Sequence, residues 1–322
     1  MVDVVALGEL LIDFVPRGSS PAGNDIFEAC PGGAPCNVLA MLSKLGRKTA
    51  FIGKLGDDVF GRRLKTTVED LGIDARGIVL DRSVNTTLAF VATGADGERS
   101  FAFYRNLGAD MMLREEELDR TLLENCRMFH FGTLSMTHPR VRTATRTAVQ
   151  NARKSGALIS FDPNLRPPLW DSLAEAKTQI EWGCAHCDIL KISDDEAEFL
   201  TGIPDAEEAG RVIRGRFPNI GLVFVTCGPN GSIAFYRDLV VSAEAFAFPN
   251  TIDTTGAGDT FCGCCLDRIL LEGLENLTNE KIQETLRFAS AAAGIVTTRK
   301  GAMLAMPEKY EIQELMYGKS NV

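Results

Sequence analysis

Basic residues are scarce in this chain of 322 residues, in which 34 Lys and Arg stand against 43 Asp and Glu. The formal net charge is therefore -9, whereas nucleic acids and anionic membrane surfaces attract basic proteins. The sequence also lacks an apolar run of the roughly 18 residues that a membrane-spanning helix needs. We therefore expect neither a nucleic-acid partner nor a membrane partner, although a small anionic substrate would need only a few local positive groups.

A secretion signal and a disulfide framework are missing as well. Residues 1–15 are apolar, but they have no basic start and are interrupted by Glu9 and Asp13. The 9 cysteines are odd in number and scattered along the chain, which is typical of a protein in a reducing compartment. The sequence therefore predicts a cytoplasmic protein.

Two groups of cysteines, at 184–187 and 262–265, have a spacing that could bind zinc. Zinc-binding pairs usually occur in short ribbon-like segments, whereas both groups fall in apolar stretches with a helical pattern. We therefore interpret these cysteines as small packing residues.

Short apolar runs alternate with longer amphipathic runs along most of the chain. The pattern predicts strands at 4–7, 49–52, 128–131, 158–161, 189–192 and 222–226, and helices at 34–45, 58–71, 141–155, 173–184, 206–216 and 261–271. Strands and helices that alternate in this way indicate an α/β fold, with a mostly parallel central sheet and helices on both faces. The length fits one large domain over residues 1–322.

Two stretches, at about 12–30 and 86–105, interrupt this alternation. The first contains two short strand patterns, Ile12–Val15 and Ile26–Cys30. In the second, apolar and polar residues alternate around the turn 94–97, which predicts a hairpin. Together they predict a small inserted antiparallel sheet, and such a sheet beside a crevice is a candidate lid. Its free edge could pair with a second subunit, which predicts a homodimer through the lid.

The 30 glycines are clustered, but two familiar phosphate-binding motifs, GxxxxGK[ST] and GxGxxG, are absent. Instead, the segment Asp253–Asp259 brings glycines to the start of the predicted helix 261–271. Backbone N–H groups at a helix N-terminus attract anions. Asp259 could simply cap this helix, or it could accept the proton of a hydroxyl that attacks a phosphoryl group held by these amides.

The segment 253–263 resembles the C-terminal signature of the ribokinase (PfkB) family of carbohydrate kinases. The segment Pro31–Asn37, followed by a helix that ends at Gly46 and then by Phe51–Asp58, is similar to the sugar-binding signature of the same family. The two signatures occur in the expected order, and the resemblance covers nearly the whole chain. It implies a ribokinase-like three-layer α/β/α sandwich with a β-sheet lid, which transfers the γ-phosphoryl group of ATP to a sugar hydroxyl.

Within the family the chain most resembles the fructokinases, through segments 8–14, 103–111, 161–170 and 190–200. This implies D-fructose as substrate and fructose 6-phosphate as product. Kinases of 2-keto-3-deoxygluconate share several of these segments and are the alternative, but their acidic sugar needs a carboxylate clamp for which only Arg105 and Arg166 are evident candidates. A non-catalytic relative that binds sugar or nucleotide is a third hypothesis, although such a protein should have lost its base or its anion hole.

The resemblance implies a role for each matching residue. Asp259 is expected to be the general base, Gly256, Ala257 and Gly258 the anion hole, and Arg166 the contact to the transferred phosphate, which its planar guanidinium suits. The residues expected to bind the sugar are Asp13, Gly32, Gly33, Asn37, Arg105 and Asn164. A carboxylate and an amide suit a polyhydroxy ligand because together they accept and donate hydrogen bonds.

The nucleotide and the ions are also placed by the resemblance. The residues expected near ATP are Lys191, Ser193, Thr226, Gly228, Gly231 and Ser290. Glu196 is expected to hold Mg2+ through water, and Asp253, Thr255 and Gly301 match the region where many relatives bind K+. The chain departs from the broad family pattern at Ser193 and Ser290, where relatives often have Asn. Fructokinases often have the same Ser at position 193. At position 290 relatives often have Asn near the adenine, so the sequence does not predict whether Ser290 contacts the adenine.

Overall fold

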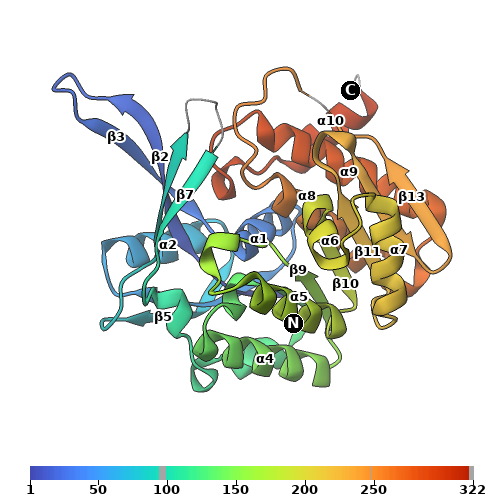
Figure 1. The fold of residues 1–322 in the computed structure, drawn as a ribbon, viewed down its shortest axis with the longest axis horizontal. Helices are drawn as coiled ribbons and strands as arrows, with labels where there is room; N and C mark the ends of the chain where they lie inside the picture. The colour runs from blue at the N-terminus through green and yellow to red at the C-terminus, as the bar shows by residue number, and fades with distance from the viewer. Residues whose placement is uncertain (94–98, 247, 319–322) are drawn as a thin grey trace.

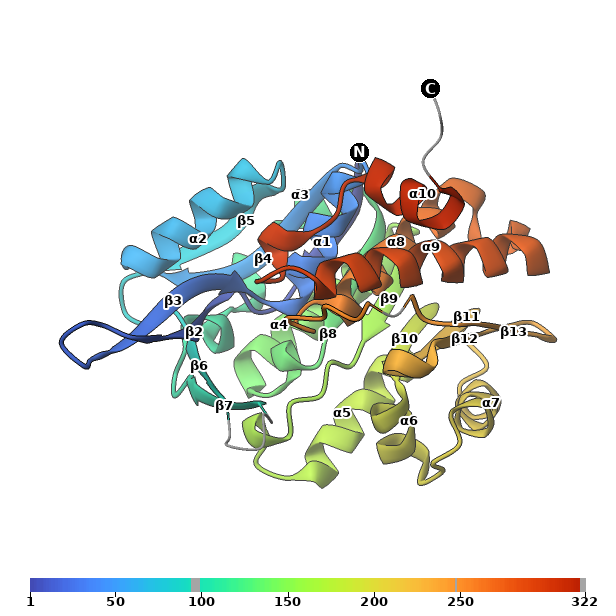
Figure 2. The ribbon, with the colours of Figure 1, turned by 90° about the horizontal axis from the view of Figure 1, so that it is seen from above.

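The computed structural model describes residues 1–93, 99–246 and 248–318, and within these residues the strands form one nine-stranded sheet and one four-stranded sheet. Figures 1 and 2 show that helices cover both faces of the large sheet and that the small sheet stands at one side of it. The large sheet has the order β13 (Leu239–Ala243), β12 (Ser232–Tyr236), β11 (Leu222–Thr226), β10 (Ile189–Ser193), β9 (Leu158–Asp162), β8 (Cys126–Gly132), β1 (Val2–Leu7), β4 (Thr49–Gly56) and β5 (Asp74–Asp81).

The six strands predicted from the sequence are confirmed and lie next to one another in the middle of the large sheet. They pair in parallel, and their apolar side chains are buried on both faces, which explains why they read as continuous apolar runs. The sequence did not predict β5, β12 and β13, which lie at the two ends of the sheet. β12 and β13 pair antiparallel with their neighbours, and β5 carries charged residues among its apolar ones.

Two sets of helices enclose the sheet, and each set packs on its own apolar core. One core includes side chains of α1 (Ala34–Lys44), α2 (Val59–Asp70), α8 (Ala257–Glu272), α9 (Asn279–Thr297) and α10 (Lys309–Tyr317). The opposite core includes side chains of α3 (Arg120–Glu124), α4 (Pro139–Lys154), α5 (Leu173–Ala185), α6 (Asp194–Thr201) and α7 (Ala206–Arg216). The three-layer α/β/α sandwich is therefore confirmed, and Figure 2 shows the two helical layers on either side of the strands.

The predicted lid is confirmed as a separate sheet with the order β3 (Asp25–Gly32), β2 (Leu11–Ser19), β6 (Leu88–Thr93) and β7 (Arg99–Tyr104). Both hairpins are antiparallel, but β2 and β6 run parallel to each other, which differs from the all-antiparallel sheet we expected. A parallel pair requires a crossover connection, and here the chain from β3 through α1, β4, α2 and β5 supplies it. The expected turn at 94–97 lies outside the described residues.

Side chains on the lid alternate between its two faces. Phe90 stacks on Phe14 with 4.8 Å between ring centroids, and it also contacts Phe27 and Tyr104 edge to face. Asp13 and Phe103 occupy the other face and line a cavity between the lid and the main body. The lid therefore presents Leu11, Asp13 and Phe103 to the cavity and a cluster of aromatic side chains on its other face.

The two cysteine groups lie in the apolar cores: Cys184 and Cys187 in one, and Cys262, Cys264 and Cys265 in the other. Over the described ranges no cluster of three or more His, Cys, Asp or Glu side chains has a geometry suited to a metal ion. No described helix has an apolar run long enough to cross a membrane.

Candidate active site

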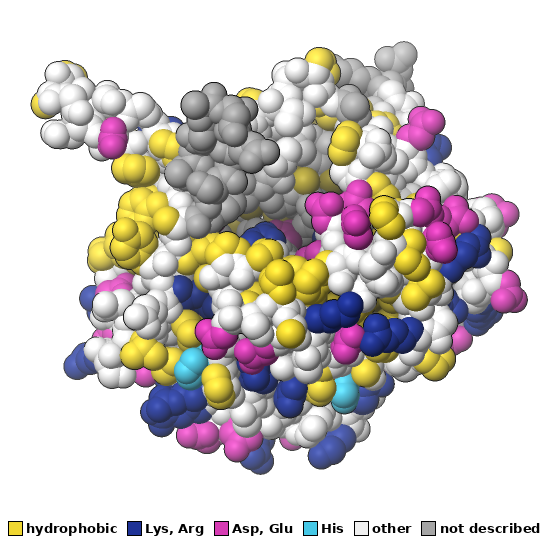
Figure 3. All heavy atoms as spheres, in the orientation of Figure 1, with side chains coloured by type: hydrophobic (Ala, Val, Ile, Leu, Met, Phe, Trp, Pro, Cys, Tyr) yellow, Lys and Arg dark blue, Asp and Glu magenta, His cyan; other side chains and the backbone are white. Residues whose placement is uncertain are grey.

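Two neighbouring cavities lie at the carboxyl end of the central strands, where β9, β10 and β11 end at Asp162, Ser193 and Thr226. One cavity of about 340 Å³ extends under the lid, and the other of about 490 Å³ lies beside α9. Thr254 and Gly258, around the N-terminus of α8, line both cavities. Figure 3 shows the hollow between the lid and the body, with charged side chains visible inside it. This is the edge of an α/β sheet at which ligands usually bind.

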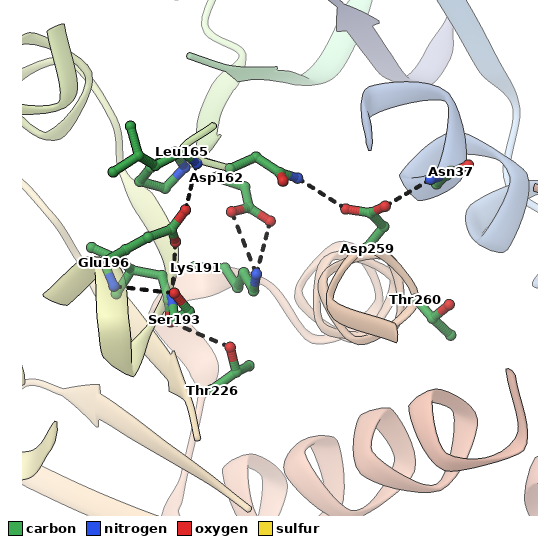
Figure 4. Close-up of polar contacts among 12 residues, drawn as sticks. Asn37, Asp162, Leu165, Lys191, Ser193, Glu196, Thr226, Asp259 and Thr260 are labelled. Carbon is green, nitrogen blue, oxygen red and sulfur yellow. Dashed lines mark hydrogen bonds and ion pairs between the residues drawn. The ribbon is translucent and has the colours of Figure 1, made fainter. Parts of the chain in front are cut away.

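Asp259 lies in the first turn of α8, as expected, and its side chain is held from two sides. The Nδ2 of Asn37 donates to Oδ2 at 2.7 Å (Figure 4), and the Nδ2 of Asn164 donates to Oδ1 at 3.1 Å. Burial raises the pKa of Asp259, while the hydrogen bond from Asn37 and the charge of Lys191 oppose this rise. A buried carboxylate with a raised pKa is a better proton acceptor than one in water.

The residues expected to form an anion hole, Gly256, Ala257 and Gly258, lie at the start of α8. Gly256 has a φ of 81° and precedes the helix, and a Cβ on it would approach the Cβ of Ala302 to 2.7 Å. The first N–H groups of a helix have no acceptor within the helix, although that of Ala257 donates to Thr254 O at 3.2 Å. A Cβ on Gly258 would lie 3.0 Å from Lys191 Nζ, so the ammonium group sits directly against this turn. Amides and an ammonium group thus converge on one place.

Lys191 reaches this place from β10 through a buried ion pair. Its Nζ lies 3.1 Å from Asp162 Oδ2, as Figure 4 shows. Burial disfavours the charge on Lys191, but the carboxylates of Asp162 and Glu196 outweigh burial and raise the pKa of Lys191. The ammonium group therefore remains protonated. Lys191, which was expected near ATP, lines the cavity under the lid rather than the cavity beside α9.

The cavity under the lid contains most of the residues that were expected to bind a sugar. Asp13 enters it from β2, and burial raises the pKa of Asp13 to about 6 against the opposing charge of Arg166. Gly32 is outside the lining but gives Asp13 room, since a Cβ there would lie 2.1 Å from Asp13 Oδ2. Gly33 lines the cavity, and a Cβ there would lie 2.4 Å from Glu9 O.

Arg166 stands at the rim of this cavity with an exposed side chain. Its Nη1 donates to Leu165 O at 3.1 Å, and none of the ion pairs among the described residues involves it. An exposed guanidinium with spare donors can move to meet a phosphate. The placement is compatible with the expected role.

Arg105 lies behind the cavity rather than in its wall. Its Nε and Nη2 donate to Asp110 Oδ2 at 2.8 and 2.6 Å, and its remaining contacts are Leu134 O and Thr137 Oγ1. The side chain is 5% exposed. In this structure its guanidinium therefore joins the end of the lid strand β7 to the body, and its expected contact to the sugar stays a prediction.

Glu9 was not expected among the site residues, yet it lines the cavity under the lid. Its Oε1 accepts the N–H of Ala34 at 2.8 Å, at the start of α1. Burial raises the pKa of Glu9 to about 7. The sequence contained a signal for it: Glu9 is an acidic residue two positions after the buried strand β1, in a segment that resembles the fructokinases. Apolar side chains of Leu11, Phe103 and Leu134 complete the wall.

The cavity beside α9 contains Thr226, Gly228, Gly231 and Ser290, as expected for a nucleotide site. Its other walls include Phe246, Phe248, Ala293 and Gly294, which the sequence did not indicate. Ser193 is not part of this wall. Its backbone N–H donates to Glu196 Oε2 at 3.0 Å and its Oγ accepts the N–H of Glu196, so Ser193 caps α6.

The residues expected to hold ions have suitable donor atoms. The Glu196 carboxylate accepts N–H groups of Leu165 at 2.6 Å and of Ser193 at 3.0 Å, and its remaining lone pairs fit contact to magnesium through water. Asp253 is buried, and its Oδ1 accepts the N–H of Thr255 at 2.9 Å. Gly301 lies in the neighbouring loop after α9, outside both cavities, where backbone carbonyls could serve a monovalent cation.

The chain is similar to known proteins over almost its whole length. A family model described as pfkB family carbohydrate kinase matches residues 1–309. Fructokinase-1 of Zea mays is 44% identical over 315 residues, which make up 97% of this chain and 97% of that protein.

Solved structures of fructokinases share its fold over almost the whole chain. Fructokinase from Xylella fastidiosa with bound ATP has a TM-score of 0.86 and 31% identity and covers 98% of both chains. Fructokinase from Vibrio cholerae O395 in a form with fructose, ADP and a calcium ion has a TM-score of 0.87 and 29% identity, covering 98% of this chain and 99% of that one. A double mutant of the latter, with fructose, ADP and a potassium ion, has a TM-score of 0.86 and 28% identity and covers 98% of both chains.

Proposed function

Because this chain belongs to the pfkB family of carbohydrate kinases, we propose that it is an ATP-dependent fructokinase, which converts D-fructose to fructose 6-phosphate. The observation that carries this proposal is the position of Asp259. Its carboxylate faces the cavity under the lid and lies directly beside the amides of the anion hole. Similarity to fructokinases of plants and bacteria supports fructose as the sugar.

Asp259 acts as the general base in the proposed reaction. A sugar hydroxyl in the cavity under the lid gives its proton to the carboxylate, and its oxygen attacks the γ-phosphorus of ATP. The bond between the γ-phosphorus and the bridging oxygen breaks, and ADP leaves. The raised pKa of Asp259 favours this proton transfer.

The charge of the transferred phosphoryl group would be stabilised by the N–H groups around Gly258 and the ammonium group of Lys191, which lie against each other. The guanidinium of Arg166, exposed at the rim of the cavity, would move in to join them. Magnesium bound with ATP would neutralise phosphate charge, and Glu196 would hold it through water. The lid covers one side of this cavity, and its closure over the bound substrates would limit loss of the phosphoryl group to water.

A neutral sugar suits this cavity better than a sugar acid. Glu9, Asp13 and Asp259 bring three carboxyl groups into its wall against the two positive groups of Arg166 and Lys191. This excess of acidic groups disfavours a substrate carboxylate. Arg105, one of two candidates for binding such a carboxylate, already forms a buried ion pair with Asp110. A 2-keto-3-deoxygluconate kinase is therefore the less favoured function.

Further parts of the proposal concern the whole protein. Residues 1–322 would act as one kinase domain, with the lid built from about 12–30 and 86–105, in the cytoplasm. Potassium would bind near Asp253, Thr255 and Gly301. The lid would pair through its free edge with a second copy of the chain to form a homodimer; at the end of its edge strand β7, Tyr104 is 68% exposed. Gel filtration that shows a monomer at working concentration would refute the dimer.

A substrate panel tests the proposed function. Fructose, ribose, glucose, adenosine and 2-keto-3-deoxygluconate would be compared in a coupled assay of ADP release, with and without potassium. We expect the highest kcat/KM with fructose and a higher rate with potassium. A higher kcat/KM with 2-keto-3-deoxygluconate would contradict the proposal, and so would failure to phosphorylate any sugar.

A further inference from the structure

The loop after β9 holds Asn164 in an unusual backbone conformation. Its φ is 49°, and only two other non-glycine residues in the described ranges, Leu107 and Arg237, have a positive φ. Asn adopts this left-handed conformation more readily than most residues, but it still costs free energy. Such a conformation persists only where the surrounding structure enforces it.

Two contacts enforce it, one on each side of Asn164. The carbonyl of Pro163 accepts hydrogen bonds from Thr133 N at 3.0 Å and from Thr133 Oγ1 at 2.5 Å. The N–H of Leu165 donates to Glu196 Oε1 at 2.6 Å, as Figure 4 shows. Thr133 is fully buried and Glu196 nearly so. Both peptide groups that flank Asn164 are therefore fixed to the body of the protein.

The result of this clamp is that the Asn164 carboxamide points at the proposed base. Its Nδ2 lies 3.1 Å from Asp259 Oδ1, while Asn37 holds Oδ2 at 2.7 Å. Two donors, one on each oxygen, fix the rotation of the carboxylate plane. A carboxylate has about four acceptor sites, so each oxygen retains a lone pair for the proton of the substrate.

We infer that Asn164 is a positioning residue, which acts on the reaction by orienting the Asp259 carboxylate, and that Thr133 and Glu196 hold it in the conformation this requires. The inference rests on the proposed kinase function. It differs from the role implied by family resemblance, in which Asn164 binds the sugar itself.

Several other charged groups around Asp259 also affect its pKa. Lys191 from β10 and Arg166 from the loop after β9 lower the pKa of Asp259. Asp162 on β9 adds a like charge, since the two carboxyl groups interact. The hydrogen bond from Asn164 also lowers it. Removal of the Asn164 carboxamide should therefore raise the pKa of the base.

The variant Asn164→Gly tests this most directly. Glycine adopts a positive φ without the penalty of a Cβ, so the change removes the carboxamide and leaves the loop conformation available. We expect kcat to fall by roughly 10- to 100-fold, the scale of a misoriented catalytic group. The acid limb of the kcat profile should move to higher pH, and fructose affinity, measured with a non-hydrolysable ATP analogue, should change little.

Matched variants distinguish a loss of orientation of the Asp259 carboxylate from a general loss of structure. Arg237→Gly replaces another positive-φ residue, in the exposed turn between β12 and β13, and should leave kcat unchanged. Asn164→Asp replaces the donor with a like charge, so we expect a larger loss of kcat and a larger rise in the pKa of the base than with Asn164→Gly. Thermal melting checks that each variant is folded.

The clamp itself is tested at Thr133. Thr133→Val removes the hydroxyl that binds Pro163 O, and we expect a smaller loss of kcat with a shift of the acid limb in the same direction. Thr133→Ser restores the hydroxyl and should recover most of that loss. If Thr133 acts through Asn164, the double variant Thr133→Val/Asn164→Gly should lose little more than Asn164→Gly alone.

Two results would overturn the inference. Weaker fructose binding in Asn164→Gly, with kcat and the acid limb unchanged, would make Asn164 a sugar ligand. Fully additive losses in the double variant would show that Thr133 does not act through Asn164. Failure of the wild-type chain to phosphorylate any sugar is a separate outcome, which would overturn the proposed function and this inference together.

Discussion

The two cavities that meet at the start of α8 are built from different chemistry. The cavity under the lid has five ionisable residues in its wall, namely Glu9, Asp13, Arg166, Lys191 and Asp259. The wall of the cavity beside α9 consists of glycines and other small, hydroxyl or apolar residues, with no charged side chain among the described ones. The first recognises its ligand through side-chain charge and hydrogen bonds, and the second through shape and backbone.

This difference predicts opposite sensitivities to substitution. A change of charge without change of size should damage the sugar cavity and spare the nucleotide cavity. A larger side chain of the same charge should damage the nucleotide cavity, because small residues provide the space for the ligand there. It should spare the sugar cavity when it is placed outside that cavity's wall. The predictions below test this contrast, beginning with the largest expected effect.

Asp259→Asn should have the largest effect, because it keeps the size of the side chain and removes the proton acceptor. We expect kcat to fall by about 10²- to 10⁴-fold, the usual contribution of a general base, while the Kd for ATP stays close to that of the wild type. Coupled kinetics and isothermal titration calorimetry measure the two quantities. Asp238→Asn, an exposed acidic residue in the turn after β12, is the matched control. Near-normal turnover in Asp259→Asn would contradict the proposed mechanism.

Ala293→Phe should close the nucleotide cavity without adding charge. Overfilling a packed site costs up to about 3 kcal/mol, so we expect the KM for ATP to rise by as much as about 100-fold. The affinity for fructose, measured by calorimetry without nucleotide, should not change. Ser290→Ala in the same helix changes a polar group but not the volume, and it should leave the KM for ATP nearly unaltered. A large effect of Ser290→Ala would break the contrast, because it would reveal recognition by a side-chain hydrogen bond in this cavity.

Asp13→Asn should weaken sugar binding through a change of charge alone. Hydrogen bonds to a charged group are stronger than neutral ones by about 1 kcal/mol, so the KM for fructose should rise by roughly fivefold. Because the pKa of Asp13 is about 6, its carboxylate is lost as the pH falls below 6. The KM for fructose should therefore rise below pH 6 in the wild type and stay flat in Asp13→Asn.

The parts of the fold that could be predicted from the sequence are those with a clear pattern within a short segment. The six central strands are short apolar runs between amphipathic helices, and this pattern follows from burial on both faces. β5 escaped prediction because charged residues interrupt its apolar pattern. β12 and β13 follow β11 with no α-helix between them, so they depart from the strand–helix alternation on which the prediction relied. The parallel pairing of β2 with β6 depends on the path between two distant insertions.

The candidate site was predictable in part for a similar reason. Asp259, Asn37 and Gly33 lie in two recognisable signatures, and the structure brings them to one cavity. Arg105 lies in an equally recognisable segment, but its burial against Asp110 depends on where the end of β7 meets the body. The clamp on Asn164 joins Thr133, Pro163, Leu165 and Glu196 from three parts of the chain, and no spacing in the sequence reveals it.

Glu9→Gln should have the smallest effect, and it tests whether the charged cavity reduces folding stability. The pKa of Glu9 is raised by burial from its ordinary value of 4.5 to about 7, so between these values the folded protein binds more protons than the unfolded chain. Stability contributed by this group is therefore lost as the pH rises from about 4.5 to about 7. We expect the free energy of unfolding of Glu9→Gln, relative to wild type, to improve between pH 5 and pH 8, measured by urea denaturation. Ser290→Ala, in the uncharged cavity, is the control, and its free energy of unfolding relative to wild type should not depend on pH. If the same quantity for Glu9→Gln also did not depend on pH, the carboxylate of Glu9 would be as stable in the folded protein as in water.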